Sequence, residues 1–161
     1  MNRLALALAL TFTLTVTADA APRTLSAGDR AAITALARAF FEAVRDGSRT
    51  GEGVFMTPAE LRGLFAPAAG VEGLVRRQLD ALDRDARDLH ARFQGGVFVG
   101  LAPQSYRGGV IDLVPCGRFA RATSRCGDGP VIEFTVGGEH RRQRIDTLAL
   151  VDGRWRVFDI R

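Results

Sequence analysis

The apolar and polar positions of the chain change their spacing near its middle. Between Ser26 and Gly47 the apolar side chains recur every three or four residues, which is typical of one buried face of an α-helix. They are Ile33, Leu36, Ala37, Phe40, Phe41 and Val44. Ser26 and Asp29 have the spacing of a capping box, and Gly47 can adopt the positive φ that ends a helix. We therefore expect a helix that starts after Ser26 and ends at Asp46 and Gly47.

Two further helices are predicted before the spacing changes. Thr57, Pro58 and Glu60 form a strong start signal, because threonine can cap, proline suits the first helical position and glutamate can bond back to the cap. A short helix is expected from there to about Phe65, and a longer one over residues 71–93. The longer segment has an apolar stripe at helical spacing, formed by Val71, Leu74, Val75, Leu79, Leu82, Ala86, Leu89 and Phe93.

After Gly95 and Gly96 the apolar positions alternate every second residue, which is typical of β-strands. Asp152 and Gly153 lie between two such runs and are a strong hairpin signal. Helices followed by a meander of antiparallel strands predict an α+β domain. Five strands are expected, at residues 97–101, 109–115, 131–136, 139–151 and 154–160.

Residues 1–20 have the features of a secretory signal peptide. A positive start precedes residues 4–16, an uncharged apolar run of 13 residues that is too short to span a bilayer comfortably. Small residues then suit cleavage by a signal peptidase after Ala20, or after Ala21. The alternative is an uncleaved amphipathic helix. We expect residues 21–161 to form a single α+β domain, periplasmic or secreted, with no membrane span.

The charge balance argues against nucleic acid as a partner. All 22 residues of the Lys and Arg type are arginines, and the formal net charge is +4 at pH 7. A scattered charge of this size is too small to predict nucleic-acid binding. The absence of lysine reflects either a GC-rich genome or selection for anion binding, and the sequence leaves both open.

The two cysteines, Cys116 and Cys126, are expected to form a disulfide in an exported protein. Closing so short a loop would remove roughly 2.5–3 kcal/mol of unfolded-chain entropy. The alternative is a metal site shared with His90 and His140, but the spacing lacks the closely paired ligands of zinc motifs. We predict no metal and no cofactor.

Two segments carry a family resemblance. They are the opening helix at residues 35–43, followed by Asp46 and Gly47, and the closing hairpin at residues 148–157. Both resemble the nuclear transport factor two-like superfamily, whose bacterial members include SnoaL-like proteins. The resemblance implies a cone-shaped, cystatin-like roll, in which N-terminal helices pack on a curved antiparallel sheet around a cavity. Some relatives use that cavity for isomerisation, dehydration or hydrolysis, but no catalytic motif of the superfamily can be matched to this chain.

The predicted hairpin brings two carboxylates together. If the Asp-Gly turn has two residues, counting outward places Asp146 opposite Asp159. Two close carboxylates raise one of the two pKa values, which suits general acid–base chemistry. The alternative is a surface salt-bridge cluster with Arg144 and Arg161, and a bulge in the long strand would break this register. The same face would carry an apolar patch made of Leu148, Leu150, Trp155 and Val157.

Three other residues are weaker candidates for acid–base chemistry. His90 could act as a proton shuttle, or as a cation at the C-terminus of a helix. Asp112 lies within an apolar run, so we expect it to be partly buried and to need a basic partner, Arg144 or Arg107. Tyr106 is the single tyrosine of the chain.

These observations favour a binding protein over an enzyme. We expect an exported, non-enzymatic ligand-binding or protein-binding module whose cavity, if open, takes a small apolar or amphipathic molecule. One alternative is a cofactor-independent isomerase, dehydratase or hydrolase that uses the candidate carboxylates, and another is a homodimer formed through the sheet face. Four aromatic side chains could line the cavity or simply fill the core: Phe40, Phe41, Phe65 and Trp155.

Overall fold

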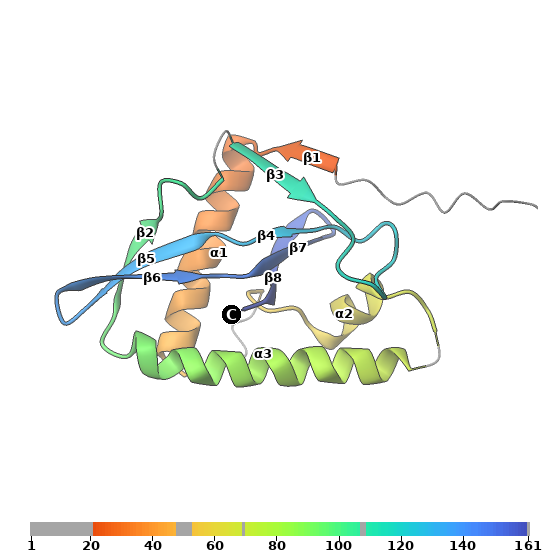
Figure 1. Ribbon diagram of the computed structural model, residues 1–161, viewed down its shortest axis with the longest axis horizontal. Helices are drawn as coiled ribbons and strands as arrows, with labels where there is room; N and C mark the ends of the chain where they lie inside the picture. Colours follow the sequence, from red (N-terminus) through yellow and green to blue (C-terminus); the bar gives the residue numbers. More distant parts are fainter. Residues whose placement is uncertain (1–20, 48–52, 69, 107–108, 161) are drawn as a thin grey trace, which may run out of the picture.

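The computed structural model describes residues 21–47, 53–68, 70–106 and 109–160 (Figure 1). The predicted signal peptide lies outside the described residues. The helices within them are α1 (Ala27–Arg45), α2 (Pro58–Leu64) and α3 (Val71–Phe93). The strands are β1 (Ala21–Thr24), β2 (Val97–Leu101), β3 (Val110–Leu113), β4 (Cys126–Asp128), β5 (Val131–Val136), β6 (Glu139–Arg144), β7 (Thr147–Val151) and β8 (Arg154–Asp159).

Both predicted capping boxes are confirmed. At the start of α1 the Ser26 hydroxyl accepts a hydrogen bond from the Asp29 N–H (3.0 Å), and the Asp29 carboxylate accepts one from the Ser26 N–H (3.1 Å). Thr57 and Glu60 make the same exchange at the start of α2, at 3.2 and 2.7 Å. Each exchange satisfies backbone donors that have no partner inside the helix, so the helices begin where the sequence predicts.

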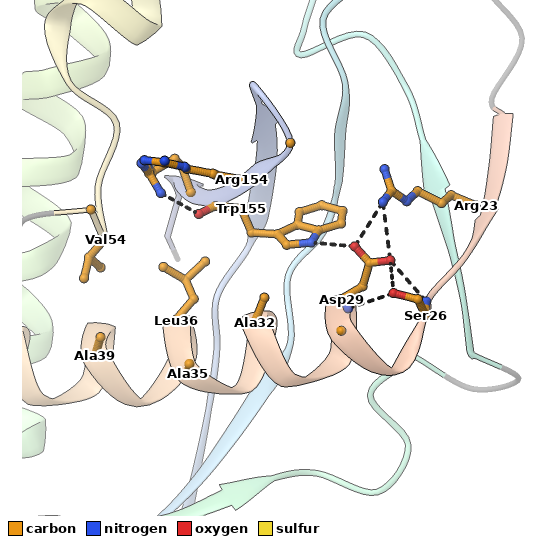
Figure 2. Close-up of a pocket in the computed structure, with 14 residues that line it drawn as sticks. Arg23, Ser26, Asp29, Ala32, Ala35, Leu36, Ala39, Val54, Arg154 and Trp155 are labelled. Carbon is orange, nitrogen blue, oxygen red and sulfur yellow. Dashed lines mark hydrogen bonds and ion pairs between the residues drawn. The ribbon is translucent and has the colours of Figure 1, made fainter.

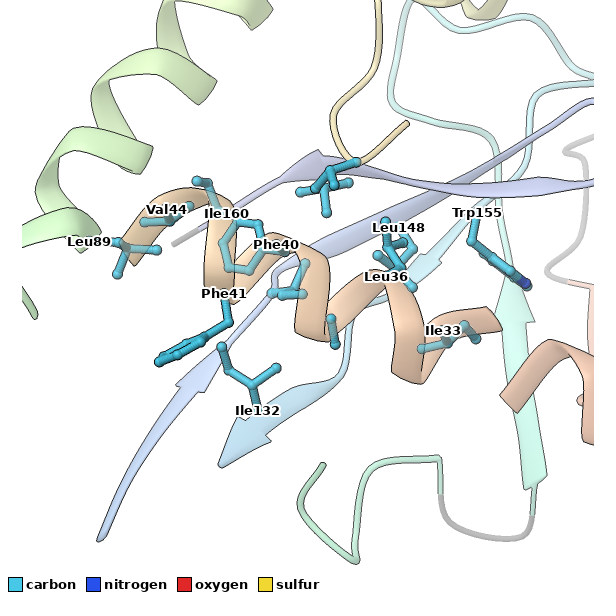
Figure 3. Packing of buried hydrophobic residues seen from close by; sticks show 14 of the residues in the cluster. Ile33, Leu36, Phe40, Phe41, Val44, Leu89, Ile132, Leu148, Trp155 and Ile160 are labelled. Carbon is cyan, nitrogen blue, oxygen red and sulfur yellow. The ribbon is translucent and has the colours of Figure 1, made fainter. Parts of the chain in front are cut away.

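The predicted apolar face of α1 is buried in the main hydrophobic core (Figure 3). Phe40 and Phe41 have no exposed surface. The ring centroid of Phe41 lies 4.7 Å from that of Phe93 in α3, and Phe93 lies 4.9 Å from Phe134 in β5. This aromatic cluster joins α1, α3 and the sheet that contains β5.

The strands pair in antiparallel fashion in three sheets, with the orders β1-β3, β2-β5-β6 and β4-β7-β8. Apart from the short β1, the helices precede the strands along the chain, so the α+β class is confirmed. The strands β1 and β4 were missed by the sequence prediction. Both are short, and each is stabilised by pairing with a strand that lies far along the chain.

The prediction of one long strand at residues 139–151 is wrong, because this segment divides into β6 and β7 at Ile145 and Asp146. Opposite the break, Gly129 and Pro130 separate β4 from β5. The Gly129 N–H donates to the Asp146 carbonyl (2.8 Å), and the Ile145 N–H donates to the Pro130 carbonyl (2.9 Å). Proline cannot donate to the ladder, and a Cβ on Gly129 would lie 1.9 Å from the Ile145 carbonyl oxygen. Both strands of this hairpin therefore bend at the same place.

Cys116 and Cys126 form the predicted disulfide, with an Sγ–Sγ distance of 2.10 Å. The bond ties the segment after β3 to the start of β4. Both cysteines are buried in a second hydrophobic cluster, which also contains Phe65 and residues of α2 and α3. Along β7, Leu148 belongs to the main core and Ala149 to the second cluster, so the disulfide lies on the opposite face of this sheet from the main core. It holds a connection that has little regular structure of its own.

Candidate functional site

A cleft of about 570 Å³ lies between α1 and β8 (Figure 2). Residues of β1, of the segment before α2 and of the turn before β8 complete its walls. Its volume is within the range of sites that bind small molecules. The cleft is therefore the candidate site, and its side chains decide what it can hold.

Small apolar side chains of α1 form the floor of the cleft. Ala32, Ala35 and Ala39 line it beside the buried Leu36, and their spacing places them on one face of the helix. Methyl groups fill little volume, so the helix leaves a hollow beneath β8. Val54 closes one side, because its carbonyl accepts a hydrogen bond of 2.9 Å from a backbone N–H of β8.

Trp155 and Asp29 lie at one end of the cleft, away from Val54 (Figure 2). Trp155 is only 5% exposed, and its indole Nε1–H donates to Asp29 Oδ1 at 3.2 Å. The guanidinium of Arg23 in β1 lies 3.0 Å from the same oxygen, and the Ser26 hydroxyl donates to Oδ2 at 2.8 Å. The buried indole thus has the partner that a buried N–H requires, and β1, α1 and β8 meet at one carboxylate.

The carboxylate of Asp29 is held in its ionised form. The hydrogen bond from the Ser26 hydroxyl is the main cause that lowers the pKa of Asp29 below its ordinary value of 3.8. The Ser26 backbone, Trp155 and the charge of Arg23 act in the same direction and outweigh burial. At neutral pH this group has no proton to give, and its oxygens already accept several hydrogen bonds.

Three arginines line the cleft: Arg23, Arg154 and Arg156. Arg23 lies with its Cζ 5.9 Å from the centre of the Trp155 ring, besides its ion pair with Asp29. Arg154 follows the hairpin turn and is exposed. Asp29 balances the charge of Arg23 and Glu60 balances that of Arg156, so the positive charge of the lining comes from Arg154.

Arg156 is positioned by the start of α2 in the same way that Trp155 is positioned by the start of α1. Its Nε donates to Glu60 Oε1 at 3.1 Å, and its Nη1 donates to the Trp155 carbonyl at 3.1 Å. Burial raises the pKa of Glu60. The hydrogen bonds from Thr57 and the charge of Arg156 lower this pKa by a larger amount together, so the net shift is downward. The acids of the two capping boxes therefore hold two successive residues of β8.

The predicted pairing of Asp146 with Asp159 is wrong. Thr147, not Asp146, lies opposite Asp159, because the register shifts between Thr147 and Leu148. Nearer the turn the predicted register is confirmed, with Leu150 opposite Trp155. The Asp146 carbonyl instead accepts a hydrogen bond at the bend between β6 and β7. Arg161, the proposed outer partner, lies outside the described residues.

His90 is half-buried near the C-terminus of α3. Its Nδ1 lies 2.8 Å from the carbonyl oxygen of Val44, and its Nε2 lies 3.2 Å from the side-chain nitrogen of Gln94. The Val44 carbonyl can only accept, so Nδ1 carries the hydrogen in this contact. This geometry suits a residue that joins the ends of α1 and α3 rather than a proton shuttle, and His90 does not line the cleft.

Asp112 and Tyr106 also lie away from the cleft. The expectation that Asp112 is partly buried is wrong, because β3 alternates and buries Ile111 and Leu113 while Asp112 is exposed. Its proposed partner Arg144 forms an ion pair with Asp128 instead, at 2.9 Å. Tyr106 has a hydroxyl that is buried without a hydrogen-bond partner among the described residues, and burial raises its pKa.

Of the four aromatic candidates, only Trp155 lines the cleft. Phe40 and Phe41 lie in the main core, and Phe65 lies in the cluster around the disulfide. From the sequence, Asp29 is predicted only as part of a helix cap, and Arg23, Arg154 and the alanine floor are not predicted. The available signals were the alanine spacing on α1 and the need of a buried indole for an acceptor.

No protein-family profile, curated protein or solved structure matches this chain. Among the described residues, no group of three or more His, Cys, Asp and Glu side chains is arranged to hold a metal ion. In the same part of the chain, none of the helices is both long enough and apolar enough to cross a membrane.

Proposed function

We propose that this protein is an exported, non-enzymatic binding domain whose cleft between α1 and β8 takes a small amphipathic molecule. The observation that carries the proposal is the lining of the cleft. An apolar floor of Ala32, Ala35 and Leu36 lies beside Trp155, beneath a set of arginines. Ligand sites commonly combine apolar walls with a few polar groups that orient the ligand.

The chemistry of the cleft supports binding rather than catalysis. Its carboxylate, Asp29, is ionised and already accepts hydrogen bonds from Ser26, Arg23 and Trp155. The predicted acid–base candidates lie on other parts of the surface or in the core, so none of them faces a molecule bound in this cleft. A general acid or base must be within hydrogen-bond reach of the reacting group.

Export and the roll-like fold belong to the same proposal. The apolar leader and the disulfide between Cys116 and Cys126 are both typical of exported proteins. The bend at Gly129 and Ile145 supports a curved sheet, as the resemblance to the nuclear transport factor two-like superfamily implies. A homodimer through the sheet remains a prediction, with Val97 and Val99 exposed on the edge strand β2 by 62% and 56%.

A fluorescence titration tests the cleft directly, because Trp155 is the single tryptophan of the chain. The probe is N-phenylnaphthylamine, a neutral apolar dye that accepts energy from tryptophan. We expect the dye to bind and to quench Trp155 emission. The variant Ala35→Arg places a long charged side chain on the floor of the cleft, so we expect it to weaken dye binding by at least about tenfold.

The matched control is Ala31→Arg, which makes the same substitution at an exposed position of α1 that does not line the cleft. It should bind the dye like the parent protein. Circular dichroism of both variants shows whether α1 is still folded. Absence of dye binding to the parent protein would contradict the proposal. Equal binding to the parent and to Ala35→Arg would also contradict it, and would indicate another apolar surface such as Val97 and Val99.

A further inference from the structure

The arginines of the cleft indicate the chemical class of its ligand, an inference that rests on the proposed function. We propose that the ligand is a carboxylate with an apolar chain. Its carboxylate pairs with the guanidinium of Arg154, and its chain lies on the alanine floor of α1.

Arg154 is the cation that the cleft leaves available. Arg23 is paired with Asp29 at 3.0 Å, and Arg156 is paired with Glu60 at 3.1 Å. Arg154 is exposed, and none of the ion pairs between described residues includes it. A guanidinium presents a planar set of N–H donors that matches the two oxygens of a carboxylate.

An amine or another cation would find the carboxylate of the cleft, Asp29, already in use. The two oxygens of Asp29 accept from the Arg23 guanidinium, the indole of Trp155, and the hydroxyl and backbone N–H of Ser26. A cationic group would therefore have to displace these donors and would also approach Arg154. A neutral molecule would make contact with the apolar floor but would form no ion pair with Arg154.

The floor distinguishes an amphipathic carboxylate from a small inorganic anion. Ala32, Ala35, Ala39 and Leu36 offer only apolar surface, and Val54 adds more at the side. A phosphate or sulfate ion would leave this surface wet and most of the volume of about 570 Å³ unfilled. A hydrocarbon chain attached to the carboxylate covers the floor while its charged end stays at the exposed edge, beside Arg154.

Displacement of N-phenylnaphthylamine by three molecules of equal chain length tests this inference. The competitors are octanoate, octanol and octylammonium, used on the full exported protein at neutral pH. Because an exposed ion pair adds up to about 1 kcal/mol, we expect octanoate to bind about fivefold more tightly than octanol. Octylammonium should bind most weakly. Added salt should weaken the binding of octanoate and leave the binding of octanol unchanged, since salt screens an exposed ion pair.

Two variants show whether the preference depends on Arg154. The variant Arg154→Gln should bind octanoate only as tightly as it binds octanol. Its affinity for octanol should equal that of the parent protein. The control Arg87→Gln removes the same charge from the exposed face of α3, so the preference should stay as in the parent protein. If the dye binds the cleft but octanol or octylammonium competes as well as octanoate, this inference is wrong and the proposed function stands. If the dye does not bind, both fail together.

Discussion

At the scale of single residues, Asp29 connects more of the molecule than any pattern around it suggests. It caps α1 through Ser26, pairs with Arg23 of β1 and accepts the indole hydrogen bond of Trp155 in β8. The capping contact spans three residues and follows from the sequence. The contact with Trp155 joins residues 126 positions apart, so it depends on the whole fold.

The carboxylate of Asp29 should make stability depend on pH. Its pKa is lower in the folded protein than its ordinary value of 3.8, mainly because of the Ser26 hydroxyl. The stabilisation is therefore present above the unfolded pKa and is lost as the pH falls through the folded pKa. We expect Asp29→Asn to lower the free energy of unfolding by about 1 kcal/mol at pH 7, because an amide replaces the carboxylate that accepts hydrogen bonds from Ser26, Arg23 and Trp155. The difference should shrink as the pH falls below about 4.

Urea unfolding followed by circular dichroism at pH 7 and at low pH measures this difference. Asp88→Asn is the matched control, because Asp88 is exposed on α3. It should change stability little at either pH. A constant difference between the parent and Asp29→Asn at all pH values would show that the charge of Asp29 does not stabilise the fold.

At the scale of elements, the bend between β4–β5 and β6–β7 is the feature that alternation of side chains did not predict. In the sequence, residues 139–151 resemble one continuous strand, because Ile145 is apolar like the strand residues around it. In the structure Ile145 is fully buried at the break. The break arises from the partner strand, where Gly129 and Pro130 interrupt the ladder. Strand periodicity describes one segment at a time, whereas this bend belongs to two segments together.

Gly129→Ala should therefore be strongly destabilising. A Cβ there would lie 1.9 Å from the backbone oxygen of Ile145, and backbone cannot rotate away as a side chain can. We expect the free energy of unfolding to fall by about 3 kcal/mol or more, measured by urea unfolding. Gly100→Ala in β2 is the control, since a Cβ there meets no described atom within 4 Å. It should change stability by less than about 0.5 kcal/mol. Equal effects of the two variants would show that the close approach between Gly129 and the Ile145 backbone does not cause the bend.

At the scale of the whole molecule, two hydrophobic clusters lie on opposite faces of the sheet that contains β7 and β8. The cleft opens where α1 presents Ala32 and Ala35 on its exposed side. The disulfide belongs to the smaller cluster. It closes a loop of sequence separation 10, which limits the unfolded chain rather than adding contacts to the folded one. The disulfide is therefore part of how this fold is stabilised.

The intact mass of the exported protein tests the proposal about its compartment. We expect a chain that begins at Ala21, because the small residues before it suit a signal peptidase. Reduction should add two hydrogen atoms, a rise of about 2 Da, as the disulfide opens to two thiols. A product that keeps residues 1–20, or a mass that reduction leaves unchanged, would contradict export with an intact disulfide.

The sequence alone determined the features that depend on neighbouring residues. The helix starts at Ser26 and Thr57 follow from side chains that bond to backbone only three residues away. The turn at Asp152 and Gly153 is equally local, because both residues adopt positive φ. The partner of Cys116 was also predictable, since the chain has only one other cysteine.

Only the tertiary structure decided the register at Asp159, the exposure of Asp112 and the composition of the cleft. The shift beside Thr147 moves Asp146 out of line with Asp159, and no local pattern marks a single extra residue. The cleft combines β1, α1 and β8, the two ends of the described chain. Its chemistry arises because distant segments meet at one carboxylate, and contacts of that kind depend on how the core packs and not on the spacing of residues along the chain.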